Sequence, residues 1–227
     1  MSLVSTHLIG FGAKRAAAAG GGDATITFAA TASKSAPASP ATFSSHAIGS
    51  AAANRYVIVA LSGYRNGSGS VPTVTVDGVS LTHVATADTA SFEAYIYAGN
   101  IASGTTASIV ATYTAGWYNL NCSVWAAYGL AGTTAYDTDA DLTATTTMTA
   151  SIDIPAGGVA VAIHGNNNAG VQTWTGLTED FDGTDAGSPG RQCTGASLAS
   201  ATLQTALSLS VTNTAGDGVL LVASWDN

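Results

Sequence analysis

Arg55 to Tyr64, with the sequence RYVIVALSGY, is the most hydrophobic and β-branched stretch of this chain. From Tyr56 to Leu61 it contains no charged or amide side chain that would mark a solvent-facing side. Such a run, closed by Ser62-Gly63, predicts a strand that is buried on both faces in the middle of a sheet. Residues 157–165 (GGVAVAIHG) and 218–225 (GVLLVASW) have the same composition: glycine, a short apolar core, and a small or polar stop. We expect long-range pairing to bring these three stretches together as central strands.

The rest of the chain alternates polar and apolar residues in short stretches separated by turn residues. Residues 72–84 (PTVTVDGVSLTHV) give the clearest local signal, since Asp77-Gly78 between two alternating runs predicts a hairpin with a type I′ turn. Prolines at 37 and 40 predict a loop over 31–40. Many short strands without helical periodicity are typical of an antiparallel β-sandwich. We predict an all-β, jelly-roll-like sandwich over residues 23–227, preceded by an N-terminal arm of residues 1–22.

Composition and charge narrow the range of partners. The 227 residues are 46% hydrophobic and only 9% charged, with six basic side chains against fourteen acidic ones and a net charge of -8. Few basic groups are available to neutralise phosphates, so we expect no nucleic-acid binding. A surface built from Thr, Ser, Asn and Gly suits dense packing against other protein, and we expect a homo-oligomer. No apolar run approaches the ~18 residues that span a membrane, so we expect no membrane insertion.

The sequence shows no catalytic signature. The chain has four histidines, none of them in a nucleophile elbow, and its only glutamates are Glu93 and Glu179. We therefore expect no enzyme. His164 ends a core strand before an Asn-rich loop, so it is either a binding residue or a hydrogen-bonded structural histidine. Cys122 and Cys193 are not part of a CxxC motif, and two buried free thiols are favoured over a disulfide.

Two acidic stretches are weak candidates for a metal site. Residues 137–141 (DTDAD) and 180–185 (DFDGTD) place carboxylates at alternate positions, and the second resembles the first half of a calcium loop. Its spacing departs from DxDxDG, and no glutamate closes it. Solvated acidic loops explain both stretches, so we expect no cofactor. Calcium is the alternative, with Asp180, Asp182 and Asp185 as its candidate ligands.

Aromatic residues in polar loops suggest contact with a saccharide. Trp117 and Tyr118 lie at a turn, and Trp174 follows an Asn-rich loop. Exposed aromatic rings beside amide groups can hold a sugar by an apolar face and a few hydrogen bonds. The alternative is that the loop tryptophans only cap the sandwich. The candidate glycan-binding residues are Trp117, Tyr118, Asn166, Asn167, Gln172 and Trp174.

The N-terminal arm combines apolar side chains with the only adjacent basic pair. Gly20, Gly21 and Gly22 predict a flexible joint between the arm and the sandwich. Apolar side chains on such a tether need a partner surface, and the basic pair suits carboxylates there. We expect the arm to anchor the protein to a neighbouring subunit. Its anchoring residues are Leu8, Ile9, Phe11, Lys14 and Arg15.

Several of these stretches together resemble one protein type. The LIGFGA segment, the Gly/Ala joint, RYVIVALSGY, VTVDGVSLTHV and TTASIVATY are similar to virion-surface proteins of tailed bacteriophages and gene transfer agents. In those proteins a short N-terminal segment anchors to the particle, and a jelly-roll-like sandwich projects as a fibre, spike or decoration module that often touches host polysaccharide. The resemblance covers most of the chain through its strand and turn pattern, and it carries over no functional residue.

This resemblance implies a structural component of a virion, in the tail, a fibre or spike, or the capsid decoration. Its implied partners are other virion proteins, bound through the arm, and host surface glycans. A carbohydrate-binding or adhesion module of a bacterial surface protein is the alternative. The order of the N-terminal segment counts against that alternative, because Lys14 and Arg15 follow the apolar stretch instead of preceding it as in a secretory signal.

Overall fold

The computed structural model describes residues 22–65, 69–89, 91–114, 116–143, 145–167, 170–184, 191–213 and 218–227. Every regular element in these ranges is a β-strand, and all strand pairs are antiparallel. The sheets pack face to face, which confirms the predicted all-β sandwich class.

The strands form four sheets, two in each half of the described chain. We call residues 22–130 the first roll and residues 131–227 the second roll. The inner sheet of the first roll has the order β1 (Thr25–Ser35), β9 (Trp117–Tyr128), β3 (Arg55–Arg65), β7 (Phe92–Asn100) and β6 (Thr82–Asp88). Its outer sheet is β2 (Ala41–Ala47), β8 (Thr106–Thr112), β4 (Thr73–Val76) and β5 (Val79–Ser80).

The second roll repeats this arrangement. Its inner sheet has the order β10 (Asp137–Asp141), β17 (Gly218–Trp225), β12 (Gly158–Asn166), β15 (Gln192–Ser200) and β14 (Thr178–Thr184). Its outer sheet is β11 (Thr147–Ile154), β16 (Gln204–Thr212) and β13 (Thr173–Thr175). If the strands are counted from the start of each roll, with the short β5 as an extra strand, both rolls have the same order. Without β5, each roll has eight strands in two layers, five in the inner sheet and three in the outer, and eight strands in two sheets are the number found in a jelly roll.

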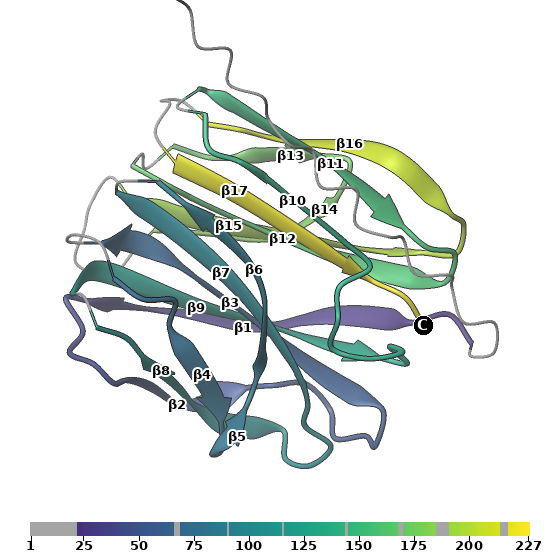
Figure 1. Ribbon diagram of the computed structural model, residues 1–227, viewed down its shortest axis with the longest axis horizontal. Helices are drawn as coiled ribbons and strands as arrows, with labels where there is room; N and C mark the ends of the chain where they lie inside the picture. The colour runs from purple at the N-terminus through teal and green to yellow at the C-terminus, as the bar shows by residue number, and fades with distance from the viewer. Residues whose placement is uncertain are drawn as a thin grey trace, which may run out of the picture.

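Three hydrophobic clusters separate the four layers. One cluster fills each roll between its inner and outer sheet, and the third lies between the two inner sheets. Figure 1 shows the layers in order, from β2, β8, β4 and β5 at the bottom to β11, β16 and β13 at the top. The inner sheets are therefore covered on both faces, which explains why their strands lack exposed positions.

The three apolar stretches found in the sequence are central strands, as predicted. β3 and β12 are the middle strands of the two inner sheets, and β17 lies beside β12. The structure adds that β3 and β12 belong to different sheets, which face each other across the inner interface. The expected type I′ turn is also present, since Asp77 and Gly78 have φ angles of 47° and 82°.

Some stretches that the sequence suggested were loops are strands. Residues 31–35 continue β1, residues 137–141 form β10, and residues 179–184 belong to β14. All three are edge segments of an inner sheet. Edge strands tolerate polar and charged side chains, so their composition resembles that of loops.

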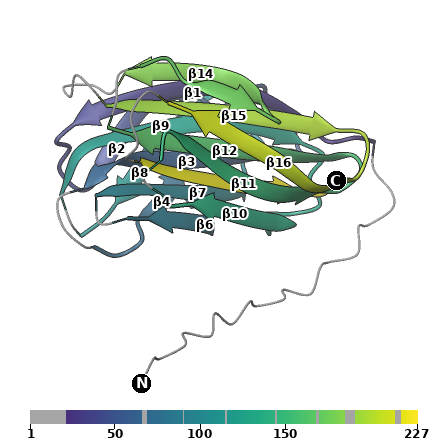
Figure 2. The ribbon, with the colours of Figure 1, turned by 90° about the horizontal axis from the view of Figure 1, so that it is seen from above.

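The two rolls are aligned so that their ends coincide. The Gly22 carbonyl accepts a hydrogen bond from the Asn227 side chain at 3.4 Å, and the Ala24 N–H donates to the Gly157 carbonyl at 2.7 Å. We call this the terminal end. At the opposite end, which we call the loop end, β3 and β12 stop and β9 and β17 begin. Figure 2 shows the C-terminus at one end of the stack and the tip of β1 at the other.

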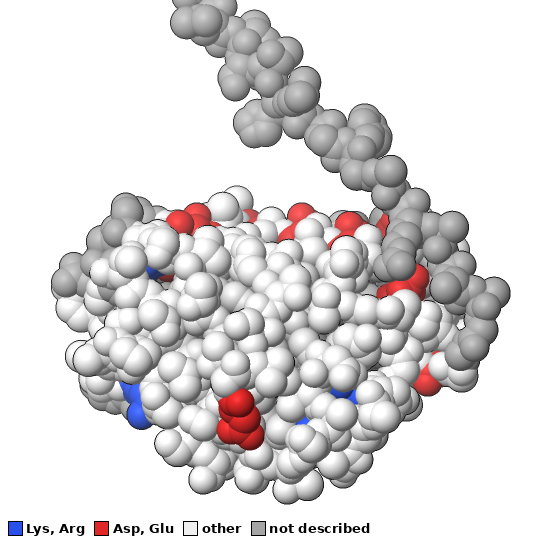
Figure 3. Space-filling view, turned by 60° about the horizontal axis from the view of Figure 1, so that its bottom comes forward, with Lys and Arg blue, Asp and Glu red and all other residues white. Residues whose placement is uncertain are grey.

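The surface carries few charges. Arg55 and Arg65 are buried, which leaves Lys34 and Arg191 as the partly exposed basic residues among those described. The face over the outer sheet of the first roll is almost entirely uncharged (Figure 3). In the part of the chain that the structure describes, no helix has the length and apolar character needed to cross a membrane.

Candidate functional site

The interface between the inner sheets changes from apolar to polar along its length. Toward the terminal end it is filled by large apolar side chains, including Ile58, Trp125, Val161, Leu221 and Trp225. Toward the loop end, the same face of β3 and β9 carries small polar groups: Ser62, Asn119, Asn121 and Ser123. Side chains two apart on a strand share a face, so this is one continuous stripe that changes character.

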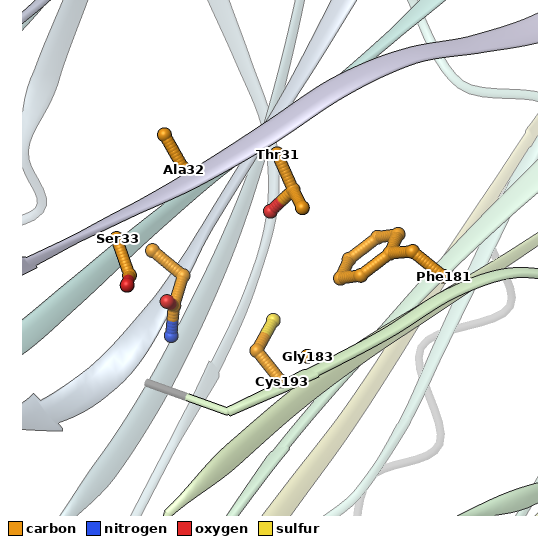
Figure 4. A pocket seen from close by; sticks show the side chains of 7 residues that line it. Thr31, Ala32, Ser33, Phe181, Gly183 and Cys193 are labelled. Atoms are coloured by element: carbon orange, nitrogen blue, oxygen red, sulfur yellow. The ribbon is translucent and has the colours of Figure 1, made fainter. Parts of the chain in front are cut away.

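A cavity of about 190 Å³ opens where the polar part of this interface meets the edge strands β1 and β14. We call it the seam cavity. In Figure 4, Thr31 and Ser33 of β1 lie on one side of the space, while Phe181 and Cys193 extend toward it from the second roll. Asn121 of β9 completes the polar lining, and Gly183 leaves the floor without a side chain. Both rolls therefore contribute to this cavity.

Asn121 is the most unusual group of the seam cavity. The residue is only 3% exposed, and within the described ranges its Nδ2 has no hydrogen-bond partner. The neighbouring polar groups are already paired, with Thr31 Oγ1 at 2.9 Å from Ser123 Oγ and Ser62 Oγ at 2.9 Å from Cys193 Sγ. A buried amide donor without a partner costs about 1–3 kcal/mol, so its retention requires an explanation.

Aromatic residues and one arginine form the rim of the same interface at the loop end. The guanidinium of Arg191 lies over the Tyr64 ring at 3.9 Å and near the Tyr118 ring at 5.8 Å. The two tyrosine rings are 5.1 Å apart, and Tyr118 is 47% exposed. Of the aromatic residues that the sequence predicted to bind a glycan, Tyr118 is thus accessible to a ligand.

Trp117 is not exposed, contrary to the expectation from its turn position. It is 3% exposed and packs between the rings of Tyr95 and Tyr113, at 6.4 Å and 6.1 Å, with the Arg65 guanidinium 5.4 Å away. The turn that precedes it is local, but the strand it begins is the second strand of an inner sheet. Packing between inner and outer sheet therefore decides its burial, and a Trp117→Ala substitution would report on folding.

The remaining glycan candidates belong to the second roll. Trp174 is 9% exposed, so the expectation that it is an open stacking surface is also wrong; its Nε1 donates to Thr194 Oγ1 at 2.9 Å. Asn166 and Gln172 are 1% exposed. Asn167 is exposed. Trp117 and Trp174 lie in different hydrophobic clusters, so they do not form one binding face.

His164 has a structural environment at the loop end of the second roll. It is fully buried, and its Nδ1 lies 2.8 Å from the Val219 carbonyl, which can only accept, so Nδ1 carries the proton. Its Nε2 accepts from the side-chain amides of Asn166 and Asn213, at 3.1 Å and 3.3 Å. Burial lowers the pKa of His164 to about 4, so the ring is neutral at neutral pH.

The carboxylates proposed for calcium do not converge. Asp180 Oδ2 accepts from Trp125 Nε1 at 2.7 Å, between the inner sheets, and burial raises the pKa of Asp180. Asp182 instead accepts from the Gln172 N–H and the Gln192 side chain. Asp185 lies outside the described residues. Within the ranges that the structure describes, no group of three or more His, Cys, Asp or Glu side chains could hold a metal ion.

The other acidic stretch joins two strands. The carboxylates of Asp137, Asp139 and Asp141 on β10 each accept a backbone N–H from β11, at 2.8 Å in all three cases. The donors are Asp153, Ser151 and Thr149. We call this the aspartate ladder. It satisfies the free edge of β11, so the alternation of DTDAD reflects a strand whose carboxylates face its neighbour.

Both cysteines are buried and free, as favoured from the sequence. Cys122 belongs to the cluster inside the first roll, and Cys193 belongs to the cluster between the inner sheets. The predicted anchoring residues Leu8, Ile9, Phe11, Lys14 and Arg15 lie outside the described residues.

Comparison with known proteins gives no assignment: no family model matches the chain, and neither a curated protein nor a solved structure matches it.

Proposed function

We propose that this chain is a structural surface component of a phage-like virion that contacts host surface glycans. It would serve in a tail, fibre or spike, or as a capsid decoration, in contact with other virion proteins through residues 1–22. The observation that carries this proposal is that the two ends of the molecule differ. Residues 22 and 227 lie together at the terminal end, whereas β3 and β12 stop, and β9 and β17 begin, at the other.

This difference between the ends fits a module that is held at one end and makes contacts with the other. A tether at residue 22 leaves the loop end and the seam cavity accessible. The exposed apolar residues are consistent with a contact surface there, since four of the six large ones lie in or beside loop-end connections. These four are Val71, Tyr118, Leu142 and Val171.

The uncharged outer face supports the same proposal. Lateral packing of identical copies brings like-charged groups together, and a face without charges avoids that repulsion. The face over the outer sheet of the first roll comes close to this requirement, since only a few charged groups interrupt its uncharged residues (Figure 3).

The seam cavity also favours the second candidate function, a carbohydrate-binding or adhesion module of a bacterial surface protein. The two candidates share a glycan-contacting loop end and differ in what holds the terminal end. The same experiment can therefore separate them.

An antibody raised against residues 22–227 tests the proposal on particles purified through a density gradient. We expect the protein to co-migrate with the particles and the antibody to reduce adsorption to host cells. Recovery in the cell-envelope fraction, with none in particles, would instead support the adhesion module.

Deletion of residues 1–20 tests the role of the arm. The shortened protein should keep the melting temperature of the full chain but should no longer enter particles. The paired substitution Lys14→Ala, Arg15→Ala leaves the apolar residues in place, so it measures how much the basic pair contributes to entry into particles. A large loss of melting temperature on deletion would contradict the anchoring role.

A further inference from the structure

We propose that the seam cavity is a binding site for a single neutral sugar ring. This inference rests on the proposed contact with host glycans and gives that contact a location between the two rolls. The predicted tryptophans are buried in other parts of the molecule, so the site is a different one from that suggested by the sequence.

The first argument is the unpaired donor. Asn121 lines the cavity, and its buried Nδ2 has no hydrogen-bond partner among the described residues. A ligand hydroxyl or an N-acetyl carbonyl in the cavity would accept from it. Thr31 and Ser33 add hydroxyl groups along the same wall, and a hydroxyl can both donate and accept. Sugar hydroxyls have the same dual character, so this lining suits a polyhydroxylated ligand.

The second argument is the absence of charge. Among the residues that the structure describes, none with an acidic or basic side chain lines the cavity. The nearest carboxylates in the sequence of β14 are occupied elsewhere, because Asp180 accepts from Trp125 and Asp182 accepts from Gln192. A charged ligand would lose its hydration without gaining an opposite charge, which is unfavourable. The lining therefore selects for a neutral ligand.

The third argument is shape. The Phe181 ring extends toward the space (Figure 4) and gives it an apolar wall, against which the C–H face of a sugar can pack. The cavity volume of about 190 Å³ is below the range of about 300–1,000 Å³ that holds drug-sized ligands. One ring fits this space better than an oligosaccharide or a nucleotide.

Binding can be measured on the full chain with methyl glycosides as probes. We would use the glycosides of glucose, galactose, mannose, rhamnose and N-acetylglucosamine, with glucuronic acid, glucosamine and sialic acid as charged comparisons. Ligand-observed saturation transfer would detect binding, and the side-chain amide resonance of Asn121 would report contact at the cavity. We expect at least one neutral glycoside to saturate the site and to shift this resonance, while the charged sugars bind at least about fivefold more weakly.

Two substitutions separate binding from folding. Asn121→Leu removes the amide but keeps its size, so it should weaken binding by about fivefold or more, the value of one net hydrogen bond, without lowering the melting temperature. Gly183→Val should block the cavity: a Cβ at residue 183 meets only the Cys193 carbonyl, at 3.8 Å, and it lies on the same face of β14 as Phe181. Gly132→Val is the matched control, since a Cβ there has no heavy atom within 4 Å.

Several outcomes would overturn the proposal. They are the absence of binding by every neutral glycoside, binding that Gly183→Val leaves unchanged, and a melting temperature lowered by Asn121→Leu, which would give the amide a structural role. These results are independent of the particle experiment. A protein that enters virions but binds no glycoside would refute the sugar site alone.

Discussion

The two rolls fill the same position at the loop end with different chemistry. In the first roll, the end of β3 is occupied by Arg65, which forms a buried ion pair with Glu93; Tyr95 donates to the same carboxylate at 2.6 Å. In the second roll, the corresponding end of β12 carries Asn166, which bonds to neutral His164. At the loop end, the interior of the first roll therefore contains an ion pair, whereas that of the second contains neutral amide and imidazole groups.

This difference shows what the topology requires. At the loop end the space between inner and outer sheet holds polar groups in both rolls, and the required property is that these groups satisfy one another. An ion pair and a set of neutral hydrogen bonds are the two arrangements that the rolls use for this purpose. Neither arrangement is complete: among the described residues, Arg65 Nε and Trp117 Nε1 in the first roll, and both side-chain polar atoms of Gln172 in the second, have no hydrogen-bond partner.

Breaking the ion pair should have the largest effect on stability. Glu93→Ala leaves the Arg65 guanidinium buried without its carboxylate, and loss of one partner of a buried pair costs about 3–5 kcal/mol. We expect this decrease in the free energy of unfolding, measured with urea. The double substitution Arg65→Met, Glu93→Leu is the control and should recover most of the loss. Equal losses for the single and double variants would show that packing, and not the unpaired charge, dominates.

Acidification should lower the free energy of unfolding through His164 in the second roll. A histidine with a lowered pKa binds its proton more readily in the unfolded chain, so its contribution is present above the unfolded pKa of 6.5 and is lost as the pH falls toward 4. The full shift corresponds to about 3 kcal/mol. Glu93 has a raised pKa because of its burial, so it contributes with the opposite sign, losing stability as the pH rises through its folded pKa.

The substitution His164→Gln isolates this effect. The variant should lose the part of the decrease in unfolding free energy between pH 6.5 and 4 that His164 causes, while keeping the contributions of Glu93 and of His46, whose pKa burial also lowers. Urea unfolding at a series of pH values measures the slope in both proteins. A slope that His164→Gln leaves unchanged would assign the pH dependence to other groups.

Much of the fold could be predicted from the sequence because its strongest signals are local. Tyr56 to Leu61 can only be a buried strand, and Asp77-Gly78 can only form a tight turn where both φ angles are positive. The repeated strand order of the two rolls does not follow from these local signals. Its clearest trace is the pattern Thr-X-Thr-Ala-Gly, which occurs at residues 112–116 and again at 212–216, each time just before the last strand of a roll.

The candidate site could not be predicted in the same way. Burial of Trp117 depends on the outer sheet that covers it, and the turn before it contains no information about that sheet. The seam cavity joins β1, β9 and the consecutive strands β14 and β15, three segments that are far apart in the chain. One signal was available: on one face, Asn119, Asn121 and Ser123 give way to Trp125 and Ala127, which marks a strand that is apolar over only part of its length.

Removing one carboxylate of the aspartate ladder should have a smaller effect on stability. Asp139→Ala removes the acceptor for the Ser151 N–H, and since the bond is exposed we expect a loss of about 1 kcal/mol. Asp88→Ala, on the exposed edge strand β6 of the first roll, is the control and should change stability by less than about 0.5 kcal/mol.

The ladder should also respond to acid. Burial opposes ionisation of Asp141, but hydrogen bonds from Thr143 and Thr149 outweigh it and lower the pKa of Asp141. This contribution is present above the usual pKa of about 3.8 and is lost as the pH falls through the lowered value. Identical effects of Asp139→Ala and Asp88→Ala at pH 7 would contradict a role for the ladder.

The smallest effect on stability is expected at the rim. Tyr118 is 47% exposed, so Tyr118→Ser should change the free energy of unfolding by about 0.5 kcal/mol or less. Trp117→Ala, one residue earlier, should cost about 3–5 kcal/mol. Thermal melting of the two variants measures the contrast. Similar losses would mean that the rim is part of the core.

The alignment of strands with the long direction of the molecule has a mechanical consequence. β1 starts beside the terminal end and pairs with β9 from Thr25 opposite Tyr128 to Ser35 opposite Asn119, near the loop end. Antiparallel hydrogen bonds run perpendicular to the strands. A pull between a tether at residue 22 and a ligand at the loop end would therefore load all bonds of this pair together in shear, and not open them one after another. A protein that holds a particle to a moving cell would resist detachment by this geometry.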